Sequence, residues 1–254
     1  MSEKTYRFSV VIPAHNEEKY IKKCICGICR AAKAAAPDKV QIIVVANRCT
    51  DRTAEIAGRC GAEVIENYDR HISRIRNAGA ARAKGEILVT VDADSVMTKG
   101  ALCEIRDLLG TGKYIGGGSN MKFDRMSLGI AVSAGYIALH LLPRFIKNRS
   151  MLSGGMFWCR KEDFEAIGGF DTELVSMEDM DFAERLSQYG KLHGKKYGTL
   201  RHSHIVTSAR KFDELGDWYL LKNRHLTKRI FTGKDRSAAD EFYYDVRDSD
   251  SQHT

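Results

Sequence analysis

Short apolar runs alternate with amphipathic stretches along the first part of the chain, up to about residue 111. The apolar runs predict β-strands at 8–12, 40–46, 63–66 and 87–91. After each run, apolar residues recur every three or four positions, which predicts helices that begin near residues 16, 51, 72 and 98. This alternation predicts an α/β fold with right-handed crossovers and a mainly parallel central sheet flanked by helices.

The pattern is less regular beyond residue 112. Further strands are predicted at 114–119, after the glycine turn at 153–155 and at 199–206. Further helices are predicted at 161–167 and where the segment 176–182 opens the last one. The segment 128–146 is largely apolar, but it is only 19 residues long and includes a proline and two polar side chains. Because it would make a poor membrane span, it predicts a packed helix, with a surface helix that dips into a bilayer as the alternative.

Length and composition agree with one globular domain. The chain has 254 residues, of which 43% are hydrophobic and 29% charged, and its sequence contains no internal repeat and no proline-rich linker. We therefore expect a single domain over residues 1–234 that consists of two unlike halves, 1–111 and 112–234. A polar tail at 235–254 follows this domain.

Charge and cysteine content narrow the choice of partners and compartment. Lysine plus arginine exceed aspartate plus glutamate by 40 to 33, and this net charge of +7 suits phosphorylated substrates or an anionic membrane surface. We expect no nucleic-acid partner. The 7 cysteines are odd in number and unevenly spaced, which argues for a reducing compartment. Because residues 1–13 include no apolar stretch long enough for a signal peptide, we expect a cytoplasmic protein that could work at the inner face of the membrane.

Polar loops follow the first, second and fourth predicted strands, with the sequences PAHNEE, NRCTD and DADS. Because the carboxyl ends of parallel strands meet at one edge of a sheet, we expect these loops to converge there. Asp92 and Asp94 lie in the last of them, and carboxylates are ligands that magnesium and manganese prefer, together with water and substrate phosphates. The pair predicts half of a metal site. The alternative is that both acids cap the helix that begins near Thr98.

A second group of acidic residues surrounds the start of the helix that the segment 176–182 is predicted to open. It consists of Asp171, Glu178, Asp179 and Asp181. The helix dipole favours acidic residues at this end, but one or two of them satisfy it. The surplus indicates a functional role for part of the group.

Six segments in this order carry a family resemblance: VVIPAHNEE, VVANRCTDRT, RIRNAGAARAKGE, VDADS, LSGGMFWCRKEDFEAIGGFD and MEDMDFAERL. Together they resemble family 2 of the nucleotide-sugar glycosyltransferases over roughly residues 8 to 190. The resemblance implies a GT-A-type, Rossmann-like single domain. It also implies that the half 1–111 binds the nucleotide and that the half 112–234 binds the acceptor.

The resemblance assigns the nucleotide to the first loops. It implies that base and ribose contact Pro13, Ala14, His15 and Glu17. At the end of the second strand the family usually has an aspartate that reads the uracil edge, whereas this chain has Asn47. Because an amide can donate as well as accept a hydrogen bond, the choice among uridine, guanosine and thymidine stays open. Arg76 matches a position that often approaches the nucleotide, with a solvated helix face as the alternative.

The resemblance also assigns the reaction centre. In the DxD segment it places Asp92 and Ala93 near the ribose, and Asp94 on a divalent cation, Mn²⁺ or Mg²⁺. It makes Asp179 the general base that activates the acceptor hydroxyl, with Glu178 as the substitute. The resemblance places Gly154 and Gly155 beside the sugar and makes His204 a candidate third ligand of the metal, although either histidine of the 199–206 strand could instead be structural. Apart from the resemblance, Arg210 in the run 207–212 could hold the diphosphate or an anionic acceptor, with a charged surface loop as the alternative.

These features predict a metal-dependent glycosyltransferase that moves a sugar from a nucleoside-diphosphate sugar to a hydroxyl of a saccharide or lipid-linked acceptor, with inversion. Peripheral membrane contact would suit such an acceptor. The alternatives are a sugar nucleotidyltransferase, although no glycine-rich phosphate loop follows the first strand, and a nucleotide-sugar-binding protein without turnover. A dinucleotide-dependent oxidoreductase is disfavoured because PAHNEE contains no glycine.

Overall fold

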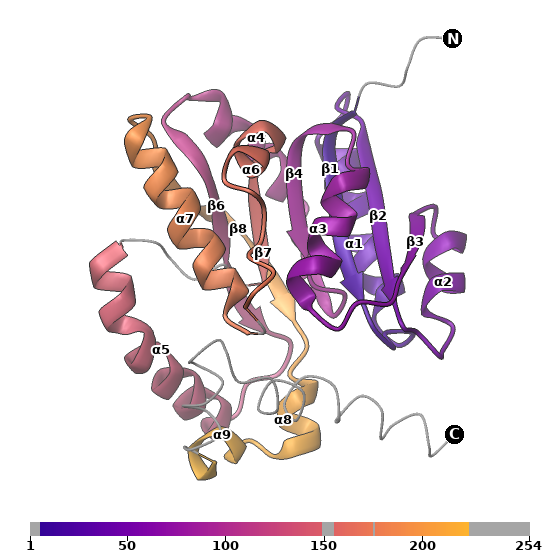
Figure 1. The fold of residues 1–254 in the computed structure, drawn as a ribbon. Coiled ribbons are helices and arrows are strands. Elements are labelled where there is room, and N and C mark those ends of the chain that lie inside the picture. Colours follow the sequence, from indigo (N-terminus) through magenta and orange to yellow (C-terminus); the bar gives the residue numbers. More distant parts are fainter. Residues whose placement is uncertain (1–5, 149–154, 175, 224–254) are drawn as a thin grey trace.

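The computed structural model describes residues 6–148, 155–174 and 176–223. Their strands form one 8-stranded sheet with helices on both faces (Figure 1). The strands are β1 (Tyr6–Ala14), β2 (Val40–Asn47), β3 (Glu63–Asn67), β4 (Gly85–Val91), β5 (Ser95–Met97), β6 (Tyr114–Phe123), β7 (Met156–Arg160) and β8 (Lys196–Thr207). The helices are α1 (Ile21–Ala34), α2 (Thr53–Arg59), α3 (Ile72–Arg82), α4 (Ala101–Gly110), α5 (Leu128–Asn148), α6 (Lys161–Ala166), α7 (Glu178–Leu192), α8 (Arg210–Leu215) and α9 (Tyr219–Lys222).

The first half of the chain forms the expected parallel sheet. Its strands lie in the order β3-β2-β1-β4, and each neighbouring pair is parallel. Phe8 of β1 is in register with Val40 of β2 on one side and with Ile87 of β4 on the other. Because β1 is buried from Phe8 to Ala14, its sequence is a continuous apolar run, which is typical of central parallel strands.

The second half continues the same sheet with mixed pairing. β7 is antiparallel to both β4 and β6, β6 is parallel to β8, and β5 is antiparallel to β8. The full order is β3-β2-β1-β4-β7-β6-β8-β5. The strand β5 was not predicted. Its three residues, 95–97, belong to the DADS loop and the sequence after it, and they become a strand by pairing with residues 205–207 of β8.

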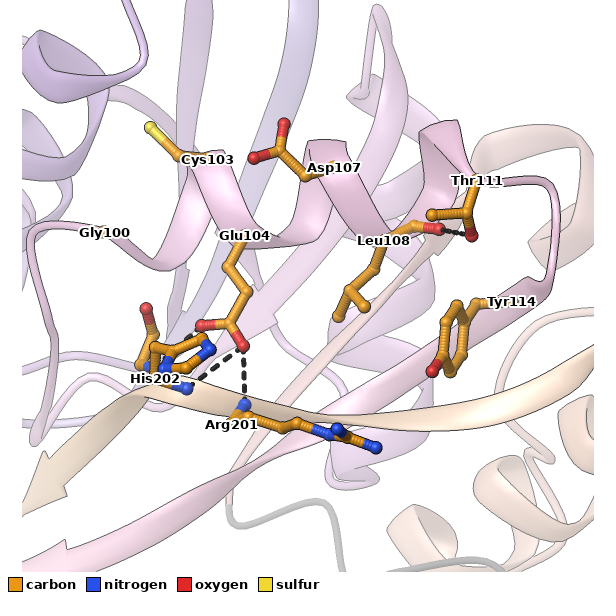
Figure 2. A pocket seen from close by; sticks show the side chains of 10 residues that line it. Gly100, Cys103, Glu104, Asp107, Leu108, Thr111, Tyr114, Arg201 and His202 are labelled. Atoms are coloured by element: carbon orange, nitrogen blue, oxygen red, sulfur yellow. Dashed lines mark hydrogen bonds between the residues drawn. The ribbon is translucent and has the colours of Figure 1, made fainter.

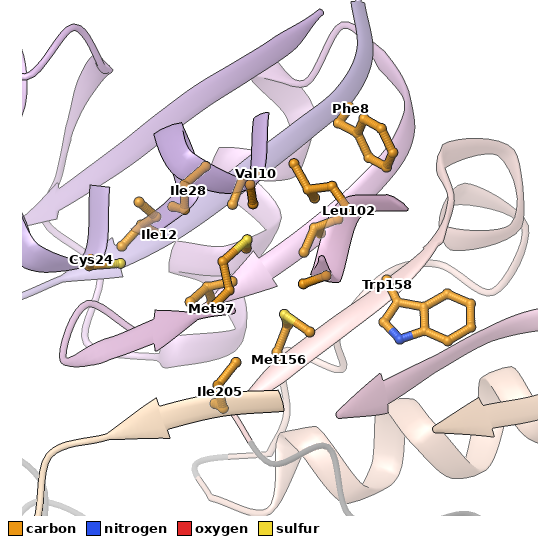
Figure 3. Packing of buried hydrophobic residues seen from close by; sticks show 14 of the residues in the cluster. Phe8, Val10, Ile12, Cys24, Ile28, Met97, Leu102, Met156, Trp158 and Ile205 are labelled. Carbon is orange, nitrogen blue, oxygen red and sulfur yellow. The ribbon is translucent and has the colours of Figure 1, made fainter. Parts of the chain in front are cut away.

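The core lies on both faces of the sheet. Val10, Ile12 and Trp158 pack on one face with residues of α1 and α4 (Figure 3). Val11 and Phe157, their chain neighbours, pack on the other face with residues of α3 and α7. This division follows from the alternation of side chains along a strand. The indole Nε1 of Trp158 donates a hydrogen bond to the Gly118 carbonyl at 2.9 Å, so its one polar atom has a partner.

Helix α3 lies close against the sheet because it has a glycine at the contact. A Cβ atom on Gly79 would lie 2.3 Å from Cγ1 of Val11 and 2.9 Å from Cγ2 of Val45. No larger residue fits without a shift of β1, β2 or α3. This contact fixes the height of α3 above the strands, and with it the position of Arg76 one turn earlier.

Several helices begin later than predicted. Helix α1 begins at Ile21, and Asn16 adopts the left-handed conformation with φ of 50° instead of opening the helix. Helix α2 begins at Thr53, after Asp51 accepts the Thr53 backbone N–H at 2.9 Å. Helix α4 begins at Ala101 with Gly100 as its N-cap. The alternative in which Asp92 and Asp94 cap this helix is therefore wrong.

The apolar segment 128–146 forms a single helix, α5, as predicted. One side of it packs on the protein: Ile130 and Ser133 are fully buried, and the Ser133 hydroxyl donates to the Asp217 carbonyl at 2.9 Å. Leu128 and Leu139, in contrast, are 76% and 66% exposed. No helix in the described ranges is long and apolar enough to cross a membrane.

Candidate active site

The loops after β1 and β2 are joined by direct hydrogen bonds at the carboxyl edge of the sheet. His15 is 5% exposed, and its Nδ1 donates to the Asn47 carbonyl at 2.8 Å. The Glu17 backbone N–H donates to the Thr53 hydroxyl at 2.7 Å. Pro13 and Ala14 complete the end of β1 beside the end of β2. The structure therefore brings the four residues predicted from PAHNEE to one rim.

Arg76 lies inside this rim and not on a solvated helix face. It is 6% exposed, and its Nη1 donates to Oε1 of Glu178 at 2.5 Å, while its Nη2 donates to Oδ1 of Asp92 at 2.9 Å. The guanidinium carbon lies 5.3 Å from the centre of the Phe170 ring. One buried arginine therefore connects the DxD segment after β4 with the first turn of α7.

The charges around Arg76 shift one another. Burial opposes the charge of Arg76, but Glu178 and Asp92 raise the pKa of its guanidinium above the ordinary value. Burial also raises the pKa of Glu178 above that of an exposed glutamate, and the Asp179 carboxylate adds to the rise, although Arg76 opposes it. The acids of this cluster compete for a single buried cation.

A second buried arginine holds the other acid of the DxD segment. Arg210, the first residue of α8, is 8% exposed, and its two Nη atoms donate to the two carboxylate oxygens of Glu17 at 2.6 Å each. Its Nη2 also lies 3.2 Å from Oδ2 of Asp94. The guanidinium carbon lies 4.7 Å from the centre of the Tyr20 ring. This fork-to-fork geometry joins residues that are 193 positions apart in the chain.

Backbone strain is concentrated at the same rim. Among the described residues, the non-glycine positions with positive φ are Asn16 at 50°, Arg48 at 48° and Met177 at 61°. Asn16 follows β1, Arg48 follows β2, and Met177 precedes the first residue of α7. A left-handed conformation is unfavourable for arginine and methionine, and such residues cluster at functional sites.

The acidic residues at the start of α7 have separate partners. Asp181 forms an ion pair with Arg185 at 2.7 Å, and Oδ1 of Asp171 accepts the Glu173 backbone N–H at 2.9 Å. Asp179 lies in the first turn, where its Oδ1 is 2.8 Å from the N–H of the next residue. Asp171 and Asp181 therefore have partners away from Arg76, whereas Glu178 is paired with Arg76 and Asp179 interacts with it electrostatically.

The hydrogen bonds of Asn47 fix the direction of its amide. Its Nδ2 lies 3.2 Å from the Asn67 carbonyl and 2.8 Å from the Asp69 carbonyl. Both are acceptors, so the nitrogen must be on this side and the amide cannot be flipped. Its Oδ1 points elsewhere and is buried without a hydrogen-bond partner. The amide therefore uses its donors inside the protein and leaves Oδ1 as a buried acceptor, since Asn47 is 1% exposed.

Gly155 lies against the DxD segment. Its φ is +74°, and a Cβ atom at this position would lie 2.8 Å from Oδ2 of Asp92. Its carbonyl accepts the Asp92 backbone N–H at 3.3 Å. Glycine is required here both by the left-handed backbone and by the close approach of the carboxylate. Gly154, predicted as its partner, lies outside the described residues. Ala93 is buried between the two acids, at 3% exposed.

The donor set for a divalent cation consists of two carboxylates. The Asp92 side chain is 40% exposed and that of Asp94 is 16% exposed. Within the described part of the chain, no group of three or more His, Cys, Asp or Glu side chains could hold a metal ion. His204 therefore does not join the pair in such a group. Its backbone N–H donates to the Thr98 hydroxyl at 3.1 Å. Two carboxylates fit a magnesium or manganese ion whose other ligands are phosphate oxygens and water.

A separate pocket of about 480 Å³ lies between α4 and β8 (Figure 2). None of the predicted site residues lines it. Glu104 lies in it and accepts the backbone N–H groups of Arg201 at 2.5 Å, His202 at 3.1 Å and Ser203 at 2.8 Å. These bonds satisfy the backbone of β8 where its register with β6 shifts. The carboxylate therefore has a structural function.

Two residues near the site were missed. Tyr20, beneath Arg210, has no signal in the sequence because it lies at the start of an ordinary amphipathic helix. Asn77 donates to the Phe170 carbonyl at 2.8 Å and accepts the Phe170 N–H at 2.9 Å, which attaches the segment before α7 to α3. The polar Asn directly after the Arg76 position in RIRN was the available signal for it.

The sequence matches known glycosyltransferases. The model of the family described as Glycosyl transferase family 2 matches residues 9–168. Glycosyltransferase AglE of Haloferax volcanii is 26% identical over 218 residues, which are 82% of this chain and 68% of that protein. The 4,4'-diaponeurosporenoate glycosyltransferase of Staphylococcus haemolyticus is 35% identical over 99 residues. This match covers 36% of the chain but only 25% of the staphylococcal protein.

Solved structures share the fold. S. aureus TarS 1-349 in complex with UDP-GlcNAc has a TM-score of 0.60 at 16% identity, over 98% of this chain and 73% of that one. Glucosyl-3-phosphoglycerate synthase from Mycobacterium tuberculosis, in complex with Mn²⁺, UDP and phosphoglyceric acid, has a TM-score of 0.58 at 18% identity, over 92% of this chain and 78% of that one. The predicted GT-A-type α/β fold is thereby confirmed.

Proposed function

Because the chain belongs to glycosyl transferase family 2, we propose that it moves a sugar from a nucleoside-diphosphate sugar to a hydroxyl of a saccharide or lipid-linked acceptor. One observation carries this proposal. Acidic residues from three separate motifs, which are Glu17, Asp92, Asp94 and Glu178, gather around two buried arginines at one rim of the sheet. The UDP-GlcNAc bound to TarS and the UDP bound to the mycobacterial synthase support a nucleotide sugar as donor.

We propose that Asp94, with Asp92 beside it, holds a divalent cation, Mn²⁺ or Mg²⁺, together with the diphosphate. When bound, such a cation would supply positive charge to the leaving diphosphate. The Mn²⁺ in the mycobacterial synthase supports this choice. Arg210 adds a fixed positive charge next to Asp94, and Arg76 keeps Asp92 in a constant orientation. His204 remains a proposed third ligand only if β8 moves.

We propose that Asp179 is the general base and that transfer proceeds with inversion. It would take the proton of the acceptor hydroxyl as that oxygen attacks the anomeric carbon. The ion pair of Glu178 with Arg76 supports this division, because it commits Glu178 to holding the arginine. Gly155 leaves room for the Asp92 carboxylate, and we propose that the sugar binds beside it and beside Gly154, which precedes it in the sequence.

Replacement of Asp179 tests its assignment as the general base. Asp179→Asn should lower turnover by a factor of about 10²–10⁴ and leave donor affinity unchanged, because the amide keeps the shape and loses the basicity. Asp181→Asn is the matched control, since Asp181 is paired with Arg185. Full activity in Asp179→Asn would contradict the assignment. Release of pyrophosphate would indicate a nucleotidyltransferase, and donor binding without release of a nucleoside diphosphate would indicate a binding protein.

We further propose that Asn47 selects bases with an N–H group at the pairing edge. Its Nδ2 is already used by residues of β3 and the loop after it, which leaves Oδ1 as an acceptor without a partner. Uracil, thymine and guanine offer a ring N–H to such an acceptor, whereas cytosine and adenine have an unprotonated ring nitrogen there. The amide would therefore act as an aspartate does at this position.

A thermal-shift panel tests the choice of nucleobase. UDP, dTDP and GDP, each with Mn²⁺, should raise the melting temperature more than CDP and ADP do, because a ligand stabilises the state it binds. Asn47→Leu should weaken the preferred nucleotide about tenfold by removing the acceptor. Asn47→Asp is not a neutral variant, because it would place a carboxylate oxygen against the carbonyls of Asn67 and Asp69. Equal shifts for UDP and CDP would exclude the role of Asn47 without affecting that of Asp179.

A further inference from the structure

The outward face of α5 is apolar, although it faces solvent. Its exposed positions recur every three or four residues and form what we call the α5 stripe: Leu128, Ala131, Val132, Gly135, Ala138, Leu139 and Leu142. Over these positions the helix is about 21 Å long, from a rise of about 1.5 Å per residue. A surface helix of a globular protein normally has its polar face outward, and here the opposite face is the one packed on the protein. The stripe is therefore an interaction surface.

An aromatic residue lies beside the first turn of α5. A Cβ atom on Gly129 would lie 3.2 Å from the ring atoms Cε2 and Nε1 of Trp218, so the indole is in direct contact with the helix. Trp218 is also 43% exposed. Tryptophan at the edge of an apolar surface is typical of a boundary between hydrocarbon and polar headgroups.

The sequence around the α5 stripe has more basic than acidic residues, although Arg125, before the first turn of α5, is paired with Asp213 and Asp217. No acidic residue occurs between Arg125 and Lys161, the interval that contains α5. Helix α9 packs against α5 and ends at Lys222, which is exposed. From Trp218 to Lys234 the sequence has lysine and arginine but no acidic residue. Positive charge thus accompanies the apolar surface on both sides in the sequence.

We propose that the α5 stripe docks on the surface of an anionic lipid bilayer, with α5 lying along the interface. An apolar helix face contributes burial into the acyl boundary, and the lysine and arginine residues that adjoin it in the sequence would contribute attraction to anionic headgroups. A second copy of the chain fits less well. A symmetric dimer through one narrow helix would bring together two copies of α5, whose sequence has basic but no acidic residues, and like charges oppose such a contact.

Docking at this surface would orient the candidate active site. Only residues 124–127 separate the end of β6 from α5, and the Asp124 side chain accepts the Ala209 backbone N–H at 2.9 Å, directly before Arg210. The bilayer would therefore adjoin the half of the protein that is proposed to bind the acceptor. This consequence rests on the proposed function, whereas the docking itself does not.

Vesicle flotation of the full chain tests the proposal. We expect the protein to float with vesicles of phosphatidylcholine that contain phosphatidylglycerol, more weakly at high salt, and to stay behind with phosphatidylcholine alone. The double variant Val132→Glu/Leu139→Glu should bind about tenfold more weakly or less, because it places carboxylates in the apolar contact. Leu192→Glu is the matched control, since Leu192 is 84% exposed on α7, away from the stripe. Unchanged thermal unfolding in all variants would show that the fold is intact.

The outcomes separate the possible occupants. Flotation that is lost in the double variant and kept in Leu192→Glu supports the proposal. The absence of flotation for the unmodified chain, or equal flotation of the double variant, overturns it. A dimer in light scattering that becomes a monomer in the double variant also overturns it, in favour of a second copy. Nucleotide binding, measured separately by thermal shift, reports on the active site and distinguishes failure of this proposal from failure of the glycosyltransferase mechanism.

Discussion

Arg76 and Arg210 are both buried between acidic residues, but the protein supports them differently. Arg76 lies in the 11-residue helix α3, which is pressed against β1 and β2 at Gly79. Arg210 begins the 6-residue helix α8, and its side-chain contacts are to Glu17, Asp94 and the ring of Tyr20. The first arginine is therefore held by the framework, and the second is held by its partners.

This difference suggests different roles at the site. The partners of Arg76 come from β4 and α7, elements whose positions the sheet fixes, so its contacts should persist through a reaction cycle. The contacts of Arg210 with Glu17 and Asp94 join the two halves of the chain at the rim, and they can be exchanged when an anion competes for the guanidinium. We expect substitutions to separate a structural effect at Arg76 from a binding effect at Arg210.

The largest expected effect is on stability at Arg76. Arg76→Leu would leave Glu178 and Asp92 near each other without a cation, which should lower the free energy of unfolding by about 3–5 kcal/mol. Urea denaturation at neutral pH measures this change. Arg76→Lys is the control. It keeps the positive charge but cannot donate to Glu178 and Asp92 as the two Nη atoms do, so it should lower the free energy of unfolding by less. A loss below about 1 kcal/mol for Arg76→Leu would contradict its role in the framework.

Arg210 should show a smaller stability effect and a larger binding effect. Arg210→Leu leaves Glu17, whose side chain is 2% exposed, without its cation. We expect a loss of about 1–3 kcal/mol, because the short helix α8 can shift in the variant and let water reach the carboxylate. Affinity for the nucleoside diphosphate should fall about tenfold or more, since a phosphate ligand of fixed geometry is lost. Calorimetry with UDP and Mn²⁺ measures it. If Arg210→Leu binds the nucleotide as tightly as the unmodified chain, the guanidinium does not face the diphosphate.

The pH dependence of stability tests the ionisation of Glu178, which is buried with Arg76 and Asp92. Because burial raises the pKa of Glu178 in the folded state, the fold favours the protonated form. Protonation of Glu178 therefore contributes to stability below the ordinary glutamate pKa of about 4.3. This contribution is lost as the pH rises through the raised pKa of Glu178 in the folded state. Relative to Glu178→Gln, the unmodified chain should lose up to about 1 kcal/mol between pH 5 and pH 8. A difference that is constant with pH would contradict the raised pKa.

The smallest expected effect is at Met177, next to the same cluster. Met177→Gly removes the cost of a left-handed methionine, but it also gives the unfolded chain more freedom, so the net gain should not exceed about 1 kcal/mol. The melting temperature measures it, with Met180→Gly, inside α7, as a destabilising comparison. If Met177→Gly destabilises as much as Met180→Gly does, the conformation of Met177 is not strained.

The fold was predictable from the sequence where burial on both faces requires a strand to consist of apolar residues. Strands β1, β2 and β4 are buried on both faces, so each is an apolar run that reads as a strand by itself. Strand β5 has no such signal, because pairing with β8 at residues 205–207 makes it a strand. Helix starts were placed too early at α1 and α4, where turns stabilised by tertiary contacts precede the helices.

At the candidate site, the sequence identified the acidic residues but not their partners. The DxD pair and the acids of α7 stood out because they follow strands or crowd a helix start. The bidentate pair of Glu17 with Arg210 could not be derived, since no local pattern relates residues 193 positions apart. The direction of the Asn47 amide was likewise hidden, because it depends on backbone carbonyls of Asn67 and Asp69 that approach only in the folded sheet.

The position of β7 has a consequence for the order of folding during synthesis. In the described sheet, β7 is the strand that pairs with both β4 and β6, and it occurs late in the chain, at Met156–Arg160. A nascent chain that has emerged as far as Val91 can pair β1 to β4, yet the open edge of β4 then waits for a strand that the ribosome has not yet made. An unpaired edge invites association with other chains. We therefore expect the interval between emergence of β4 and of β7 to be the period in which the nascent chain is most prone to association with other chains.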